Sequence, residues 1–284
     1  MRSLKVVLIT ISVFVQIIAN QNKATAQNMY SGMRHDGEFG IALGAAHYFG
    51  DINTRGKINR PKIAFGAFYR KQFGDYVAGR LSATFAQVGY SDVYSKNEFQ
   101  RLRNLSFNSN IFEVALQGDF NFFKFNPIDP DYRFTPYVTL GVGVFGFNPY
   151  TYLGGKKYYL QPLGTEGQGT TAYPDRKKYS LTALSFPLGV GIKYSITDQM
   201  NIGFEITHRF TTTDYLDDVS KTYAGAQVFK DPIAQKLQDR SYEFGTPIGA
   251  AGRQRGFSGQ KDQYVTAMIS ITFNLSSYSC PSAR

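Results

Sequence analysis

Hydrophobic and polar residues alternate in two adjacent segments between Leu181 and Ser220, with the polar turn Thr197-Asp198-Gln199 between them. A period of two predicts β-strands, and the short turn predicts an antiparallel hairpin. The apolar face continues for about ten residues in each strand, which is the length a tilted strand needs to cross a bilayer. The apolar positions are Leu184, Phe186, Leu188, Val190 and Ile192 in the first strand, and Met200, Ile202, Phe204, Ile206 and Phe210 in the second.

The same alternation recurs along the rest of the chain and predicts eight strands in all. The connections after the odd-numbered strands are long, and those after the even-numbered strands are short. Bacterial outer-membrane barrels have this asymmetry, with short periplasmic turns and longer extracellular loops, whereas a secreted β-sandwich has no reason to sort its loops by length. We therefore expect an eight-stranded antiparallel up-and-down transmembrane β-barrel over residues 37–275. The six further segments are 37–48, 61–73, 76–90, 109–123, 134–147 and 262–275.

The N-terminus has the pattern of a secretory signal peptide, residues 1–26. Arg2 and Lys5 precede a short apolar run, and Ala24-Thr25-Ala26 provides small residues at a cleavage site. A flexible periplasmic lead-in, residues 27–36, and a polar periplasmic tail, residues 276–284, would then flank the barrel. The signal peptide agrees with an outer-membrane location.

Composition and charge exclude some functions. The chain has 284 residues with 20 Tyr, 24 Phe and no Trp, which suits sheets but does not separate a barrel from a sandwich. The formal net charge of +10 comes from dispersed Lys and Arg, so nucleic-acid binding has little support. The single cysteine, Cys280, excludes an internal disulfide; it is a free thiol or a link to a partner protein.

Charged residues at the predicted inward positions define a lumen network of four acids and four bases. An eight-stranded barrel is only wide enough for its side chains to fill it, and buried charges need partners. We therefore expect ion pairs that plug the lumen, in preference to a polar channel, which needs more strands. The eight residues are Glu38, Arg70, Arg80, Glu113, Asp119, Lys193, Glu205 and Arg209.

No catalytic, cofactor or metal pattern stands out in the sequence. Some small outer-membrane barrels modify lipids with Ser and His at the rim, and His208 lies near the outer end of a predicted strand. Alternation places His208 on the apolar face, which favours a structural residue at the membrane interface. His35 and His47 have no nucleophile motif beside them. We expect a protein that is not an enzyme and has no small-molecule substrate.

The segment Thr211 to Ser220 concentrates three acids, Asp214, Asp217 and Asp218, beside Tyr215. Closely spaced carboxylates can bind a hard cation. The spacing does not fit an EF-hand loop, and a hydrated rim anchored by an aromatic residue is the expectation that we favour.

Four stretches of the chain resemble a known family. They are Ala46-His47-Tyr48-Phe49-Gly50-Asp51, the strand Phe134 to Phe145, the strand Phe186 to Tyr194, and Asp214-Tyr215-Leu216-Asp217-Asp218-Val219-Ser220, which is the most specific. Together they resemble the PorG-type outer-membrane proteins of the Bacteroidetes type IX secretion machinery, over about residues 37–275.

The resemblance implies a non-enzymatic barrel subunit that contacts the periplasmic ring of a secretion apparatus, while cargo proteins and the adhesins of gliding motility cross through other components. On this view the partner contacts come from the lead-in, the turn 124–133 with Asp129 and Asp131, and the tail with Cys280. The acidic string with Asp214, Tyr215, Asp217 and Asp218 is the family motif. A barrel that binds at the cell surface through loops 148–180 and 211–261 is the alternative.

Overall fold

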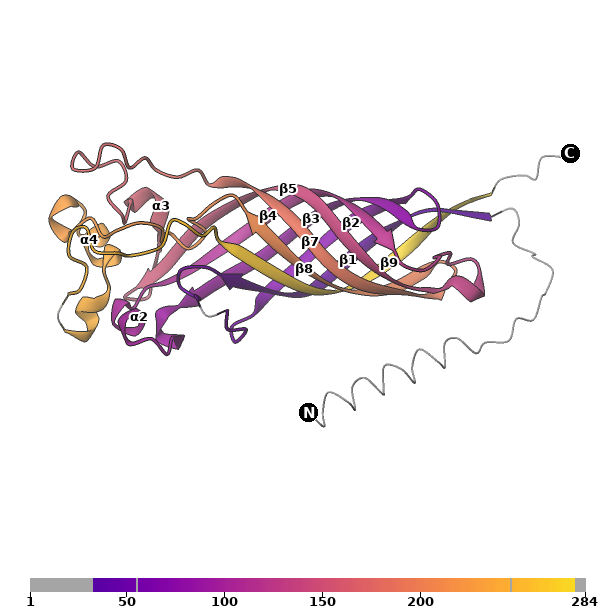
Figure 1. Ribbon diagram of the computed structural model, residues 1–284, viewed down its shortest axis with the longest axis horizontal. Helices are drawn as coiled ribbons and strands as arrows, with labels where there is room; N and C mark the ends of the chain where they lie inside the picture. The colour runs from indigo at the N-terminus through magenta and orange to yellow at the C-terminus, as the bar shows by residue number, and fades with distance from the viewer. Residues whose placement is uncertain (1–32, 55, 246, 279–284) are drawn as a thin grey trace, which may run out of the picture. The chain divides into compact units, whose positions relative to one another are not determined.

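Eight long strands form a closed antiparallel barrel in the computed structural model, which describes residues 33–54, 56–245 and 247–278 (Figure 1). The predicted signal peptide, the lead-in up to residue 32 and Cys280 lie outside the described residues. A ninth, short strand, β6, pairs only with β5. The strands are β1 (Met33–Phe49), β2 (Lys62–Gln72), β3 (Val77–Ser91), β4 (Ser106–Asn121), β5 (Phe134–Leu153), β6 (Lys156–Tyr159), β7 (Thr182–Thr197), β8 (Met200–Thr211) and β9 (Gln263–Tyr278).

Each barrel strand pairs with its neighbour in the chain, and β1 pairs with β9 to close the sheet. The eight predicted strands and the up-and-down topology are therefore confirmed. Strand boundaries differ by up to six residues, and three of the differences change a predicted segment. The first strand begins at Met33, so the end of the predicted lead-in is strand; β9 continues to Tyr278, into the predicted tail. β5 runs on to Leu153, so the predicted loop 148–180 begins as a β-hairpin with β6.

The exterior of the barrel is a band of exposed apolar side chains. On β4 and just beyond it, Phe112, Leu116 and Phe122 are 65%, 63% and 54% exposed. Ten residues of strand extend about 34 Å, and a tilt of about 40° reduces this to about 26 Å along the barrel axis. That height matches the apolar band of an outer-membrane barrel. Among the described residues, no helix is both long and apolar enough to cross a bilayer.

The connections differ in length at the two ends. One end has the connections 73–76, 122–133 and 198–199, and the other has 50–61, 92–105, 154–181 and 212–262. We call the four long connections the loop cap; it lies beyond the left-hand end of the barrel in Figure 1. Its helices are α2 (Glu98–Arg103), α3 (Leu160–Leu163) and α4 (Pro232–Gln238), with the 3₁₀ turns η1 (Asp92–Tyr94), η3 (Ala226–Val228) and η4 (Ser241–Phe244); η2 (Pro130–Tyr132) lies at the other end.

The connection 122–133 closes the end of the barrel opposite the loop cap. Phe125 and Ile128 are 2% and 3% exposed, so the connection folds inward. The Lys193 ammonium nitrogen of β7 lies 4.1 Å from the centroid of the Phe125 ring, and the ring of His35 packs edge-on against the same ring. An apolar plug therefore lies directly beneath the charges of the lumen.

Candidate functional site: the charged lumen and the loop cap

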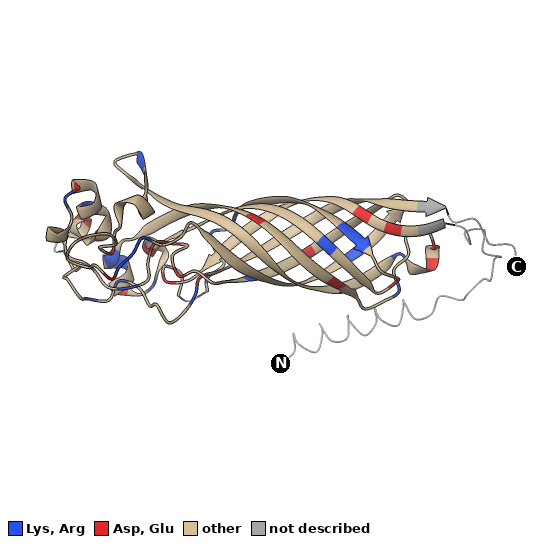
Figure 2. Ribbon diagram, turned by 90° about the horizontal axis from the view of Figure 1, so that it is seen from above, with Lys and Arg blue, Asp and Glu red and all other residues tan. Residues whose placement is uncertain are grey.

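Six of the eight predicted lumen charges form one connected layer near the short connections (Figure 2). Arg70 binds two acids: its Nη1 is 2.9 Å from Glu38 Oε2, and its Nε is 2.6 Å from Asp119 Oδ2. Lys193 Nζ reaches Glu38 Oε1 at 3.2 Å. Arg80 joins Asp119 at 3.4 Å and Glu205 at 2.6 Å. This layer holds three acids and three bases, so its formal charge is zero.

The remaining two charges form a second layer nearer the loop cap. Arg209 Nε lies 2.6 Å from Glu113 Oε2, and the other oxygen of Glu113 accepts hydrogen bonds from the hydroxyls of Ser185 and Tyr264. Arg209 also donates to the Thr266 hydroxyl at 2.6 Å. This layer is neutral as well. Sequence alternation located all eight side chains inside the barrel, and the structure brings each of them to an opposite charge.

These two layers fill the lumen. Glu38 is fully buried, Arg70 is 2% exposed and Arg209 is 3% exposed. Most of their polar atoms bond to each other or to Tyr137, Thr139 and neighbouring polar groups, as buried charges require. Arg80 Nε and Asp119 Oδ1 are buried without a hydrogen-bond partner. The barrel interior is therefore a packed polar core, and moving an ion through it would first require breaking buried ion pairs.

The predicted acidic string, Asp214 to Ser220, holds the loop cap together. Leu216 and Val219 are buried in the main apolar cluster at 0% and 1% exposure. Tyr215 stacks on Tyr179 with ring centroids 4.5 Å apart. Asp214 accepts a hydrogen bond from the Ser220 hydroxyl at 2.6 Å, which closes the string on itself.

The carboxyl groups of Asp217 and Asp262 both contact the hydroxyl of Tyr48. The Tyr48 oxygen lies 2.6 Å from Asp217 Oδ2 and 2.8 Å from Asp262 Oδ1, and all three side chains are buried. A hydroxyl carries one hydrogen and can donate to only one of the two acids. The second short contact therefore needs a proton on one of the carboxyl groups.

The pKa values of the cap carboxyls agree with this. Burial raises the pKa of Asp217 and that of Asp262 well above the usual range; the neighbouring carboxylates add to the rise, and the hydrogen bonds from Tyr48 oppose it. Burial also raises the pKa of Asp51 to about 7, where the backbone N–H of Phe257 opposes the rise. These directions favour the protonated form of one of the two carboxyls, as the contacts of Tyr48 require.

Asp218 contacts residues of the third and fourth long connections of the loop cap. It adopts a left-handed backbone conformation (φ 67°) and accepts hydrogen bonds from the hydroxyls of Thr165 and Tyr179. Arg255 lies against it, with Nη2 3.6 Å from Asp218 Oδ2 and Nη1 3.2 Å from Glu166 Oε1. Burial nevertheless raises the pKa of Asp218 to about 6, against the lowering effect of Arg255.

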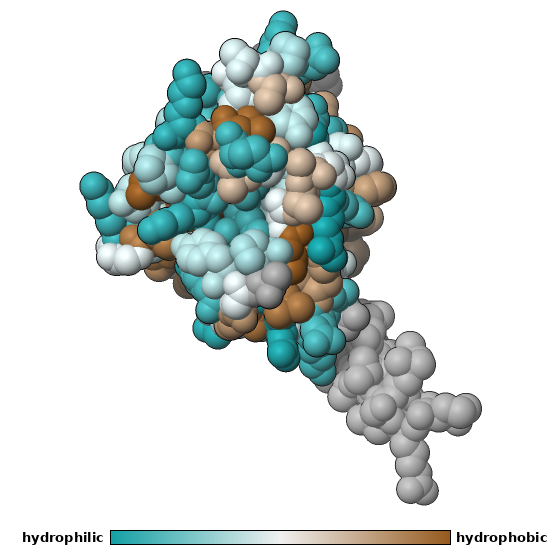
Figure 3. Space-filling model, turned by 90° about the vertical axis from the view of Figure 1, so that its left-hand side faces the viewer, coloured by the Kyte–Doolittle hydropathy of each residue, from teal (hydrophilic) through white to brown (hydrophobic). Residues whose placement is uncertain are grey.

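A further arginine ties the first and second long connections to the fourth. Arg103 of α2 binds Asp92 through two nitrogens, at 2.7 and 2.8 Å, and donates to the backbone carbonyls of Asp51 and Arg255. The loop cap is therefore held by buried charge pairs in addition to its apolar cluster. Figure 3 shows that its outer face is mostly hydrophilic, with scattered hydrophobic patches.

The expectation of a hydrated rim at the acidic string is wrong. Asp214, Asp217 and Asp218 are 4%, 1% and 0% exposed, so the string is not a hydrated rim, and these carboxyls cannot touch a partner unless the cap opens. Within the described ranges, no three His, Cys, Asp or Glu side chains are arranged to hold a metal ion.

The other predicted residues lie at the two rims of the barrel. In the short connection 122–133, Asp129 caps η2 by accepting from the Asp131 N–H at 3.1 Å, and Asp131 is exposed. His208 lies on the outer face of β8, where its Nε2 is 2.7 Å from Gln263 Oε1 and its ring packs on Phe210. This environment is that of the structural interfacial histidine expected from the alternation.

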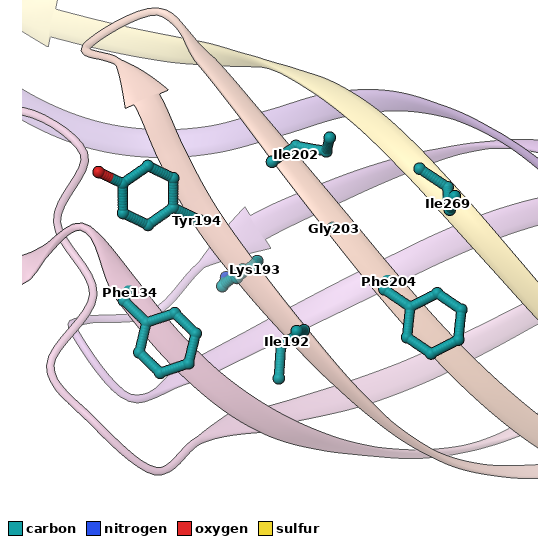
Figure 4. A pocket seen from close by; sticks show the side chains of 8 residues that line it. All are labelled: Phe134, Ile192, Lys193, Tyr194, Ile202, Gly203, Phe204 and Ile269. Carbon is teal, nitrogen blue, oxygen red and sulfur yellow. The ribbon is translucent and has the colours of Figure 1, made fainter. Parts of the chain in front are cut away.

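The outer face also carries a shallow depression over Gly203 near the short connections, with a volume of about 340 Å³. In Figure 4 the rings of Phe134, Tyr194 and Phe204 surround it on β5, β7 and β8. Its exposed lining is almost entirely apolar, and it lies on the surface that faces lipid. Acyl chains can fill it, but it offers no reactive group.

An apolar exterior of bilayer height, a sealed polar interior and long connections at one end define the class: this protein is an eight-stranded β-barrel of the outer membrane, with the loop cap outside the cell. The chain belongs to the family described as "Domain of unknown function (DUF6089)", which matches residues 13–230. No curated protein sequence matches the chain.

Solved structures of other small outer-membrane barrels are similar to this one. The N-terminal β-barrel domain of Pseudomonas aeruginosa OprF is 11% identical, with 85% of this chain and 100% of that chain covered and a TM-score of 0.37. Neisserial surface protein A is 8% identical, with coverage of 86% and 100% and a TM-score of 0.42. Yersinia pestis Ail, the attachment invasion locus protein, in complex with the heparin analogue sucrose octasulfate, is 12% identical, with coverage of 84% and 99% and a TM-score of 0.38.

Proposed function

We propose that this protein is a non-enzymatic outer-membrane anchor subunit of a protein secretion apparatus of the type IX kind. The observation that carries the proposal is the sealed lumen. Two neutral layers of buried ion pairs and the Phe125 plug favour a barrel that works through its two ends and not as a conduit. The string Asp214 to Ser220, which marks the resemblance to PorG-type proteins, supports the assignment to this kind of machinery.

The periplasmic contact would use the connection 122–133. It is the longest of the three short connections, and η2 holds it in a fixed shape through the cap provided by Asp129. Asp131 is exposed there and offers a carboxylate to a basic partner surface. Cys280 and the lead-in remain proposed contacts.

The test is a pull-down of the tagged full-length protein from native outer membranes after crosslinking. We expect periplasmic ring proteins to co-purify, and Asp131→Lys to reduce their recovery about tenfold, the factor that 1.4 kcal/mol of lost interaction corresponds to. Asp175→Lys is the matched control, because it reverses an exposed aspartate in the loop cap at the opposite end. Equal recovery from the two variants, or no periplasmic protein at all, would refute the proposal.

A surface-binding barrel is the second candidate, and the ordered loop cap favours it. Buried pairs such as Arg255 with Glu166 and Arg103 with Asp92 fix the cap, so that it presents a defined surface to the medium. Replacing residues 212–262 by a short linker separates the two functions. Loss of cell-surface binding with intact export would support the second candidate, and unchanged binding would count against it.

A further inference from the structure

A groove of about 270 Å³ opens on the outside of the barrel at a fork between strands. β5 pairs with β7 as far as Gly146, opposite Thr182, and with β6 from Tyr150, opposite Tyr159. Between these two pairings, the edge of β5 faces the groove. The side chains that matter for the argument are Asn110, Phe112, Asn148, Lys157 and Tyr159, and Gly146 forms the floor.

The groove lies at the upper border of the apolar band. Below it, Phe112 and Val144 are 65% and 50% exposed and face lipid. Above them, Gln87, Asn110 and Asn148 stand side by side on three neighbouring strands. A row of amides directly above exposed phenylalanines places the groove at the headgroup level of the outer leaflet.

The hairpin of β5 and β6 gives the groove a cationic, aromatic wall. The Lys157 ammonium nitrogen is 3.7 Å from the centroid of the Tyr150 ring and 4.7 Å from that of Tyr159. Throughout the described residues, no carboxylate pairs with Lys157, and no acid lines the groove. Asn148 Oδ1 is buried without a hydrogen-bond partner. The groove therefore offers a fixed positive charge and an unused amide oxygen.

The opposite face of the β5–β6 hairpin packs against the loop cap and does not line the groove. Leu153 and Tyr158 pack against the apolar cluster of the cap, and Lys156, paired with Leu153, belongs to that face. Two adjacent lysines with the same charge thus point to different environments. Of the two lysines, only Lys157 lines the groove.

We propose that this groove binds the phosphorylated sugar headgroup of an outer-leaflet glycolipid. The acyl chains lie on Phe112 and Val144, and Lys157 pairs with a phosphate. Sugar hydroxyls bond to Asn110 and Asn148, while the ring of Tyr159 packs on a sugar ring. A glycerol or ethanolamine phospholipid headgroup has no ring for Tyr159 to contact. This site is independent of the proposed secretion role, because it lies at the opposite end of the barrel from the proposed periplasmic contact.

Gly146 allows the groove to be filled without disturbing the barrel. A Cβ placed on it meets only the Leu181 carbonyl oxygen, at 3.9 Å, and its backbone is ordinary strand. Gly146→Leu therefore inserts a side chain into the groove at little structural cost.

The experiment is native mass spectrometry of the purified full chain in detergent, titrated with diphosphoryl lipid A. We expect one lipid A to bind, Lys157→Gln to weaken binding about fivefold and Lys156→Gln to change it by less than about twofold, since one lysine near an anionic surface contributes about 1 kcal/mol. Gly146→Leu should abolish binding while the barrel keeps its unfolding temperature. Dephosphorylated lipid A should bind about as weakly as diphosphoryl lipid A binds to Lys157→Gln.

Three results would overturn the proposal. The two lysine variants could behave alike, which would indicate only general surface charge. Phosphatidylglycerol could bind as tightly as lipid A, which would remove the role of the sugar. Inorganic phosphate at millimolar concentration could displace the lipid, which would indicate a site for a free anion.

Discussion

Replacing Tyr48 by Phe tests the shared-proton site of the loop cap with the smallest possible change. The hydroxyl contacts Asp217 and Asp262 at 2.6 and 2.8 Å, and the ring is fully buried in the apolar cluster. The ring stays, so no cavity beyond one oxygen atom forms. A hydrogen bond to a charged group contributes about 1.5–3 kcal/mol, and a buried acceptor left without a donor costs a similar amount. We expect the free energy of opening the cap to fall by about 2–3 kcal/mol.

Hydrogen–deuterium exchange measures that free energy segment by segment. A loss of 2–3 kcal/mol corresponds to about 30- to 150-fold faster exchange of the 214–220 amides. Barrel strands should keep their protection, because they do not depend on the cap. Tyr264→Phe is the matched control: it removes an equally buried hydroxyl, whose partner is Glu113 of the lumen.

The effect of Tyr48→Phe on amide exchange should also depend on pH. At pH 5 both carboxyls can be protonated and can bond to each other, so the effect of Tyr48→Phe should shrink. At pH 8 it should be largest. Equal protection of 214–220 in the wild type and the variant at pH 8 would refute the idea that the hydroxyl holds the two acids together.

Two further predictions concern the charges. Arg70→Ala removes one ion pair from each of two buried carboxylates, which keep only Lys193 and Arg80, and leaves the layer with one excess negative charge; it should destabilise the barrel by about 3–5 kcal/mol in urea unfolding titrations. Arg133→Ala breaks a half-exposed pair and should cost less than about 1 kcal/mol. Burial raises the pKa of Asp214 and Asp218 from 3.8 to about 6, so the closed cap binds more protons than the open one between these values. Its opening free energy should therefore fall as pH rises from about 4 to 6, and amide exchange in the cap, corrected for intrinsic chemistry, should become faster; constant or slower corrected exchange over that range would contradict the assignment.

The barrel was predictable because one rule repeats along the chain. A period of two assigns each residue to lipid or lumen, and an error of one residue would reverse every face. The same rule located Arg70 and Glu205 correctly inside. It also placed His208 outside. Strand ends were less certain, since β5 continues to Leu153 with Tyr and Thr residues that suit either a loop or a strand.

The loop cap was not predictable in the same way. No period applies there, and the partners lie far apart in the chain: Tyr48 meets Asp217 across 169 residues, and Arg103 meets the carbonyl of Arg255 across 152. Three acids within five residues suggest exposure when they are considered alone. Only the arrangement around Tyr48 and Arg255 shows why the fold buries them.

The lumen pairs have a consequence for how the barrel enters the membrane. Lys193 and Glu38 are 155 residues apart, and Arg209 and Glu113 are 96 apart, so neither pair can form within a single hairpin. A half-built sheet in hydrocarbon would leave Lys193 and Arg209 without these partners, at a cost of several kcal/mol each, whereas Glu38 can already pair with Arg70 across the β1–β2 hairpin. We therefore expect the strands to enter the bilayer together with the pairing of β1 and β9, because only the closed barrel gives every lumen charge its partner.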